Sequence, residues 1–203
     1  MAATLLQKSW PGREEVVAKL VDIFRLSKAS LPLCIHGPSG SGKSAVLRSV
    51  LSHLQLHTAY LDCIALPTPR SLFESALNQL ANHIPCAANG YSCWAACDST
   101  AGFVQGVHAI VGQLGRVVLV FDKAERLAIR GGSLLQSLLT LPTLCQATDG
   151  RVQVIFVAEA LWTEPSYADN TDFRRLTTIR FSGYNKAQLA TIIKRDFGAV
   201  GAP

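Results

Sequence analysis

The sequence has few charged residues and lacks any long apolar run. Charged residues make up 16% of the 203 residues and apolar residues 49%, so there is enough apolar surface for one folded domain with a core. The absence of a run of about eighteen apolar residues argues against a transmembrane helix. Residues 1–10 contain no basic segment followed by an apolar stretch, so no secretory signal is predicted and we expect the chain to stay inside the cell.

The chain also lacks a dense run of lysine and arginine. Its net charge of +5 is spread along the sequence, which permits contact with nucleic acid but does not require it. No helix-turn-helix pattern is recognisable, which argues against direct sequence-specific DNA binding. Any DNA contact is therefore expected to reach the phosphate backbone and to weaken steeply with salt.

Six cysteines predict reduced thiols in an intracellular chain. Three of them follow His83, in the pattern His83-x2-Cys86-x6-Cys93-x3-Cys97. Zinc modules usually space their ligands as two Cys-x2-Cys pairs, so we favour a surface insertion over 85–100 that contains thiols, with a metal site as the alternative. The six residues are Cys34, Cys63, Cys86, Cys93, Cys97 and Cys145.

Apolar strands and amphipathic helices alternate along the chain, which predicts an α/β domain with a central parallel sheet. The last predicted helix, 185–197, is expected to turn Leu189, Ile192 and Ile193 inward. The predicted strands are 31–36, 57–63, 116–122, 151–158 and 177–181, and the other predicted helices are 14–26, 42–54, 71–83, 102–114 and 133–145.

A glycine-rich segment follows the first predicted strand. Residues 37–44 (GPSGSGKS) match the phosphate-binding pattern G-x-x-x-x-G-K-[ST] at every fixed position, between a strand and a helix. The glycines let backbone amides turn inward around phosphates, and the helix start adds its positive dipole end. Lys43 can reach the β and γ phosphates, and Ser44 can coordinate Mg²⁺. The predicted ligand is ATP with Mg²⁺, although the loop alone suits adenine and guanine nucleotides equally. The predicted ligand-binding residues of the loop are Gly37, Pro38, Ser39, Gly40, Ser41, Gly42, Lys43 and Ser44.

Asp122 ends the strand 116–122 and is the predicted carboxylate ligand of Mg²⁺, together with Ser44. The next residue is Lys123, whose ammonium cannot accept a proton from water. Glu125 is a catalytic candidate, but three residues from Asp122 its carboxylate would be displaced, at a cost on the order of a hundredfold or more. The alternative is that Lys123 and Glu125 form an exposed ion pair.

These residues together resemble the AAA+ subunits of the origin recognition complex. The resemblance spans nearly the whole chain, and the segment with lysine after the aspartate is its most selective part. In hydrolytic AAA+ proteins a glutamate stands at the place of Lys123, so the resemblance implies that ATP is bound with absent or very weak hydrolysis. The four segments that carry it are 10–14 (WPGRE), 37–44, 122–127 (DKAERL) and 154–162 (VIFVAEALW).

The resemblance implies a three-layer AAA+ sandwich with strand order 5-1-4-3-2 and a helical lid. We expect the nucleotide-binding core at 1–183 and the first helix of a truncated lid at 184–203. Gly12 and Arg13 would lie beside the adenine. ATP would serve as a structural and regulatory ligand at an interface with other subunits of the complex, in the nucleus, with DNA contacted indirectly or through its backbone.

Two further positions follow from the resemblance. The usual polar sensor after the fourth strand would fall at Ala158 or Glu159, which departs from the family pattern. Arg174 and Arg175 stand where such proteins often place an arginine that reaches a neighbour's ATP site; the alternative is a solvated turn.

Two functions thus remain open from the sequence. The first is an ATP-binding assembly subunit for DNA replication initiation. The second is an autonomous phosphate-loop ATPase or nucleotide kinase, although neither an acceptor-binding region nor an arginine-rich lid of the kind used by kinases is recognisable.

Overall fold

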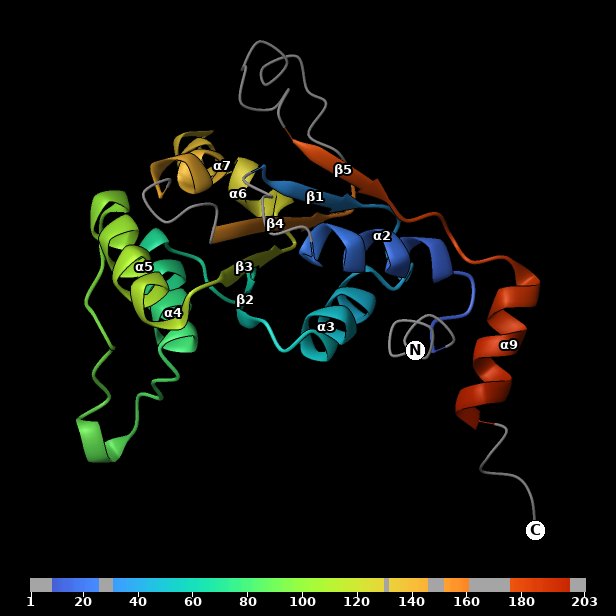
Figure 1. Ribbon diagram of the computed structural model, residues 1–203, viewed down its shortest axis with the longest axis horizontal. Coiled ribbons are helices and arrows are strands. Elements are labelled where there is room, and N and C mark those ends of the chain that lie inside the picture. Colours follow the sequence, from blue (N-terminus) through green and yellow to red (C-terminus); the bar gives the residue numbers. More distant parts are fainter. Residues whose placement is uncertain (1–8, 26–30, 130–131, 146–151, 161–175, 198–203) are drawn as a thin grey trace.

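A five-stranded parallel sheet forms the centre of the computed structural model, which describes residues 9–25, 31–129, 132–145, 152–160 and 176–197 (Figure 1). Its order is β2-β3-β4-β1-β5, and every neighbouring pair is parallel. Read from the other edge this is 5-1-4-3-2, so the predicted fold class is confirmed. The strands are β1 (Leu33–His36), β2 (His57–Asp62), β3 (Val117–Asp122), β4 (Val152–Ala158) and β5 (Thr177–Arg180).

Helices cover both faces of this sheet, because alternate residues of each central strand point to opposite sides. In β3, Leu119 and Phe121 pack with α4, α5 and α7, whereas Val118 and Val120 pack with α2 and α3. Both central strands, β3 and β4, are buried along their full length, as expected for a continuous apolar run. The helices concerned are α2 (Glu14–Arg25), α3 (Lys43–His53), α4 (Pro69–Leu80), α5 (Thr100–Leu114) and α7 (Gly132–Leu144).

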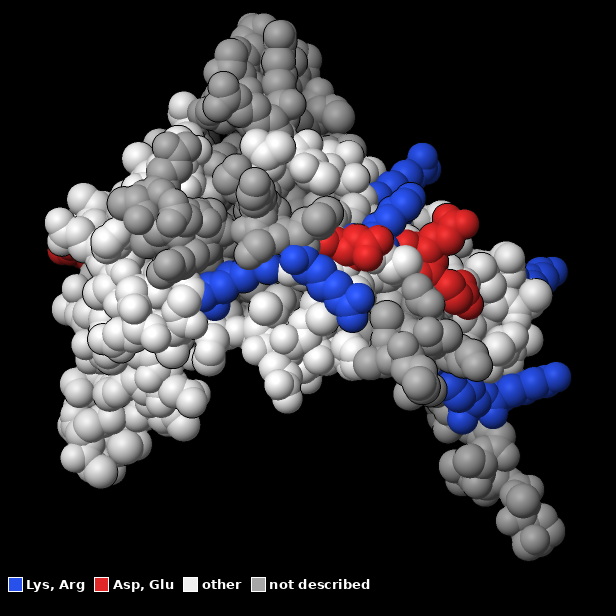
Figure 2. Space-filling view, in the orientation of Figure 1, with Lys and Arg blue, Asp and Glu red and all other residues white. Residues whose placement is uncertain are grey.

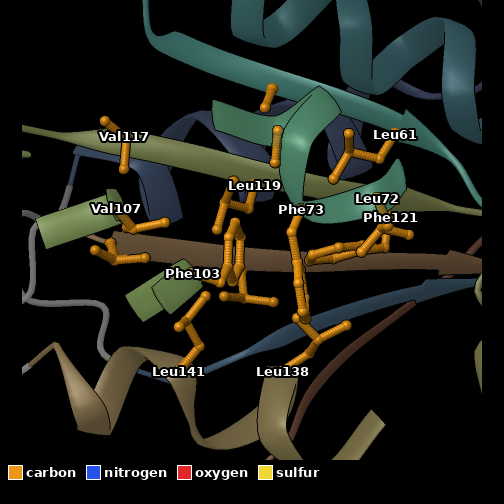
Figure 3. Close-up of a cluster of buried hydrophobic side chains, with 14 of the residues drawn as sticks. Leu61, Leu72, Phe73, Phe103, Val107, Val117, Leu119, Phe121, Leu138 and Leu141 are labelled. Carbon is orange, nitrogen blue, oxygen red and sulfur yellow. The ribbon is translucent and has the colours of Figure 1, made fainter. Parts of the chain in front are cut away.

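Aromatic stacking consolidates the larger of the two clusters (Figure 3). The rings of Phe73 on α4 and Phe103 on α5 are stacked with centroids 4.5 Å apart, and Phe121 and Phe156 stack across β3 and β4 at 5.5 Å. Each pair adds about 0.5–1.5 kcal/mol beyond its buried area. The stacks therefore hold two helices and the two central strands at fixed separations.

Helix α4 begins two residues before its predicted start. Thr68 accepts a hydrogen bond from the amide of Ser71 at 3.1 Å, and the Ser71 hydroxyl accepts one from the amide of Thr68 at 3.1 Å. Pro69, with its φ preset for a helix, follows this capping box. Apolar periodicity misses the boundary because the polar cap precedes the first buried residue, Leu72.

The segment 85–100 projects from the body of the protein between α4 and α5 (Figure 1). It contains one short 3-10 helix, η1 (Ala87–Asn89), and is tied to α4 where Asn78 accepts a bond from the amide of Trp94 at 2.7 Å. Its thiols do not form a metal cluster, since no group of three potential ligands converges among the described residues. The six cysteines, all in the described part of the chain, form no disulfide.

Helix α9 (Lys186–Phe197) stands apart from the sheet at the far right of Figure 1. Leu189 is 45% exposed and Ile193 55% exposed, while Ile192 is half-buried. The prediction that this stripe faces inward is wrong for Leu189 and Ile193, which are exposed because α9 stands apart from the central sheet. Among the described residues, no helix combines the length and apolar composition that crossing a membrane requires.

Candidate nucleotide-binding site

A cavity of about 300 Å³ opens at the carboxyl ends of β1, β3 and β4. This edge is where parallel α/β sheets place ligands, because the loops that leave the strands can surround a crevice there. Its walls are the glycine-rich loop, the end of β3 and the end of β4. The lining residues are Ser39, Gly40, Gly42, Lys43, Ser44, Ala45, Asp122, Lys123, Glu125, Val157, Ala158 and Glu159.

The glycine-rich loop owes its path to close packing and to left-handed backbone. A Cβ on Gly37 would lie 2.0 Å from the carbonyl oxygen of Phe181, so only glycine lets the chain leave β1 beside the end of β5. Gly40 and Gly42 have φ of +72° and +86°. Gly42 is the N-cap of α3, whose first helical residues are Lys43 and Ser44. The helix therefore starts with its amide groups at the cavity.

Lys43 places its ammonium inside the loop. The residue is 8% exposed, and its Nζ donates to the carbonyl oxygens of Gly37 at 2.7 Å and Pro38 at 3.0 Å. These bonds hold a positive charge at the rim of the cavity next to the start of α3. The arrangement suits a triphosphate, whose oxygens can replace the two carbonyls as acceptors.

Asp122, at the end of β3, faces this charge across the cavity. It is 9% exposed, and its Oδ1 accepts a bond from the backbone amide of Lys123 at 3.0 Å. Its Oδ2 accepts a bond from the hydroxyl of Tyr60 at 2.8 Å. Both carboxylate oxygens are therefore held in position, while each keeps a lone pair for a cation.

Tyr60 is a site residue that the sequence analysis missed. Burial raises the pKa of Tyr60 to about 12, against a lowering by the Ser44 side chain, and the Asp122 carboxylate raises the pKa further. The signal available in the sequence was a hydroxyl-bearing aromatic two residues before the end of a strand, which alone does not distinguish a site residue from a packing one.

Lys123 pairs with an aspartate of the neighbouring strand. Its backbone has φ of +57°, and its Nζ pairs with Asp62 Oδ2 of β2 at 2.7 Å, with both side chains substantially exposed. The hydrogen bond from Lys123 lowers the pKa of Asp62, and the same bond raises the pKa of Lys123. The alternative interpretation, an exposed Lys123–Glu125 ion pair, is not what the structure shows, because the ammonium of Lys123 pairs with Asp62 of the neighbouring strand.

Glu125 is the first residue of the short helix α6 (Glu125–Ile129) and lines the cavity. The turn before it is fixed by the amide of Ala124, which donates to the carbonyl of Val157 at 2.9 Å. The Oε2 atom of Glu125 is buried and has no hydrogen-bond partner among the described residues. A carboxylate oxygen thus lies in the cavity wall with its acceptor capacity unused.

Arg13 contacts the phosphate loop from outside the cavity. Its Nε and Nη2 donate to the carbonyl oxygen of Ser41 at 3.2 and 3.1 Å, and Nη2 donates to the carbonyl of Ser182 at 2.5 Å. The guanidinium also stacks on the ring of Tyr184 at 4.0 Å. The preceding Gly12 lies against α9 and has φ of +74°. Neither Gly12 nor Arg13 lines the cavity described above.

The remaining predicted positions divide into two groups. Ala158 and Glu159 line the cavity at the end of β4, but the Ala158 side chain has no polar atom to offer a phosphate. Arg174 and Arg175 lie outside the described residues. On the face shown in Figure 2, Lys and Arg side chains form separate groups near acidic ones and no continuous basic stripe, in line with the dispersed charge of the sequence.

A family profile described as the AAA ATPase domain matches residues 9–157. The chain belongs to the AAA ATPase domain family. Membership implies nucleotide binding. The match begins just before the WPGRE segment and ends on β4, so it includes the glycine-rich loop, Asp122 and Lys123.

Curated relatives narrow the family further. The chain is 30% identical over 190 residues to human "Origin recognition complex subunit 5", covering 91% of this chain and 42% of that protein. It is 37% identical over 97 residues to "Origin of replication complex subunit 5" of Arabidopsis thaliana, covering 47% of this chain and 18% of that protein. The chain thus spans less than half the length of these relatives. The resemblance to origin recognition complex subunits is confirmed.

Solved structures agree in fold. A chain of the "Structure of Drosophila ORC bound to DNA" superimposes with a TM-score of 0.76 at 23% identity, covering 98% of this chain and 50% of that chain. The crystal structure of Cdc6p from Pyrobaculum aerophilum superimposes with a TM-score of 0.67 at 18% identity, covering 94% of this chain and 50% of that chain. At these identities the likeness establishes the AAA+ fold.

The residues at the cavity fit Mg²⁺ and a triphosphate. Mg²⁺ prefers hard oxygen ligands, and the Ser44 hydroxyl and the Asp122 carboxylate supply them. Lys43 and the amides at the start of α3 supply the positive field for phosphate. The unpartnered Oε2 of Glu125 in the same wall is compatible with an ordered water beside such a ligand.

Proposed function

We propose that the chain binds ATP with Mg²⁺ as a subunit of an origin recognition complex, and that ATP supports assembly rather than being hydrolysed. The triphosphate would lie along the loop from Gly37 to Ser44, with Lys43 on the β and γ phosphates. Mg²⁺ would lie between Ser44 and Asp122. The curated relatives, which are subunits of such a complex, support the role in replication initiation.

The observation that carries the assembly role is the position of Lys123. The residue after the metal-binding aspartate is an ammonium paired with Asp62, so it offers water no proton acceptor. ATP that is bound and not cleaved acts as a ligand that stabilises whichever conformation or interface binds it best. The nucleotide therefore contributes free energy to assembly in this proposal.

The remaining features of the proposal extend the family resemblance. Residues 1–183 form the nucleotide-binding core and 184–203 begin a helical lid, with Gly12 and Arg13 on the adenine side. Partners are the other subunits of the complex, and DNA is contacted indirectly or through its backbone. The protein would work in the nucleus, where replication origins are found.

An autonomous ATPase is the second candidate, and Glu125 is the observation that favours it. Its Oε2 is buried without a partner in the cavity wall, where a carboxylate could orient water. Because Glu125 is displaced from the residue directly after Asp122, we expect any such turnover to be reduced on the order of a hundredfold or more.

Equilibrium binding and steady-state turnover of the same preparation separate the two candidates. A fluorescent ATP analogue should bind in the presence of Mg²⁺, Lys43→Ala should abolish binding, and Lys194→Ala, an exposed lysine on α9, should bind like the wild type. Phosphate release should stay at background. Steady release that both Lys43→Ala and Glu125→Gln abolish would instead establish the ATPase.

Assembly is tested with the other subunits of the complex. ATP should increase the co-purification of the chain with them, and a non-hydrolysable analogue should be equally effective because cleavage is not needed. Lys43→Ala should remove this dependence on nucleotide. Equal assembly with and without nucleotide would contradict the proposed role.

A further inference from the structure

One tyrosine donates a hydrogen bond to the predicted carboxylate ligand of Mg²⁺. Tyr60 lies on β2, the edge strand next to β3, in register with Val120. Its hydroxyl donates to Asp122 Oδ2 at 2.8 Å. The phenol thus contacts the carboxylate at the end of β3.

Arg48 of α3 packs against the ring of Tyr60. The guanidinium carbon of Arg48 lies 3.5 Å from the ring centroid, an arrangement that attracts a cation to the aromatic face. Arg48 follows Ser44 by four residues on α3, so both side chains lie on one side of the helix. The helix that carries one predicted metal ligand therefore also holds the ring that contacts the other.

Gln79 of α4 hydrogen-bonds the backbone of Tyr60. Gln79 accepts a bond from the amide of Tyr60 at 2.8 Å and donates to its carbonyl oxygen at 3.2 Å. The amide side chain therefore satisfies both backbone groups of an edge strand, which would otherwise face solvent. This pairing holds the strand at the residue whose hydroxyl reaches Asp122.

Such a fixed hydroxyl suits the support of a metal ligand. Its bond to Oδ2, together with the amide bond of Lys123 to Oδ1, sets the orientation of the Asp122 carboxylate. Mg²⁺ requires near-ideal octahedral geometry, so it is sensitive to small rotations of its ligands. Partners of this kind typically change metal affinity by about 10- to 100-fold when they are removed.

We propose that Tyr60 is a positioning residue for the Mg²⁺ of bound ATP, acting through Asp122. This inference rests on the proposed binding of ATP with Mg²⁺. The phenol is neutral and does not contact the nucleotide itself in this scheme. Its loss should therefore weaken the Mg²⁺-dependent part of ATP binding and leave metal-free binding unchanged.

The test compares Tyr60→Phe with the wild type over a range of Mg²⁺ concentrations, using a fluorescent ATP analogue as the probe. The Mg²⁺ concentration that gives half-maximal binding should rise about 10-fold, and binding in EDTA should stay the same. In an Asp122→Asn background, Tyr60→Phe should cause no further change. Tyr91→Phe, which removes a hydroxyl from an exposed ring, is the matched control.

The outcomes distinguish the positioning role of Tyr60 from the proposed binding of ATP with Mg²⁺. Wild-type protein that shows no Mg²⁺-dependent ATP binding would overturn both. Wild-type protein that binds as proposed, with Tyr60→Phe superimposing on it, would overturn the positioning role alone. An equal loss of affinity with Mg²⁺ and in EDTA, or a lowered melting temperature that accounts for the loss, would assign Tyr60 a purely structural role.

Discussion

The buried guanidinium of Arg13 leads to a quantitative prediction about stability. Arg13 is 4% exposed and donates four hydrogen bonds to three backbone carbonyls, those of Gly12, Ser41 and Ser182. Hydrogen bonds from a charged group contribute about 1.5–3 kcal/mol each, and a buried carbonyl left without a partner costs about 1–3 kcal/mol. Since bonds to one acceptor are not additive, we expect Arg13→Ala to lower the free energy of unfolding by about 4 kcal/mol.

This loss should be visible as a change in melting temperature. For a chain of this size each kcal/mol corresponds to about 2–4 °C, so Arg13→Ala should melt about 10 °C below the wild type in thermal unfolding followed by circular dichroism. Arg13→Lys keeps the charge but lacks the planar guanidinium that reaches the carbonyls of Ser41 and Ser182 together. Its melting temperature should therefore lie between those of Arg13→Ala and the wild type. ATP affinity should fall as well, because Ser41 belongs to the phosphate loop.

A matched arginine provides the control. Arg70 forms an exposed pair with Glu74 at 2.9 Å on α4, and Arg70→Ala should leave the melting temperature close to that of the wild type. If Arg13→Ala melted together with Arg70→Ala, the guanidinium would not stabilise the fold, and the reasoning from its buried contacts would be refuted.

Two further changes test the loop and the acidic edge. Gly37→Ala should lower the melting temperature and prevent ATP binding, because its Cβ would lie 2.0 Å from a backbone carbonyl; Gly40→Ala, which meets nothing within 4 Å, should cost only the strain of its left-handed backbone, about 1 kcal/mol. The pKa of Asp62 is lowered and the pKa of Lys123 is raised. Their ion pair therefore stabilises the fold at pH values between the ordinary pKa values of the two groups. This stabilisation is lost as the pH falls through the lowered pKa of Asp62, or as it rises through the raised pKa of Lys123. NMR titration should find the Asp62 pKa below its usual range and returned toward it in Lys123→Met, and an unchanged pKa in that variant would contradict the pairing.

The architecture was largely predictable from local patterns. Strand order, the alternation of strands and helices, and the position of the phosphate loop all followed from apolar periodicity, a short motif and a family resemblance. Local signals failed where a polar cap decided the outcome, as at the start of α4, where Thr68 and Ser71 set the boundary. They also failed for α9, whose apolar residues Leu189 and Ile193 remain exposed although their spacing is helical.

The sequence by itself determined which chemical groups are available: a loop of glycines before Lys43 and Ser44, a carboxylate at the end of β3, and an ammonium directly after it. Only the tertiary structure decided which of them meet. Lys123 reaches Asp62 because β2 and β3 are neighbouring strands and the backbone of Lys123 has a positive φ. Tyr60 reaches Asp122 because the same two strands are neighbours. Such contacts join residues about sixty positions apart, and their geometry depends on strand register and side-chain packing, which local periodicity does not encode.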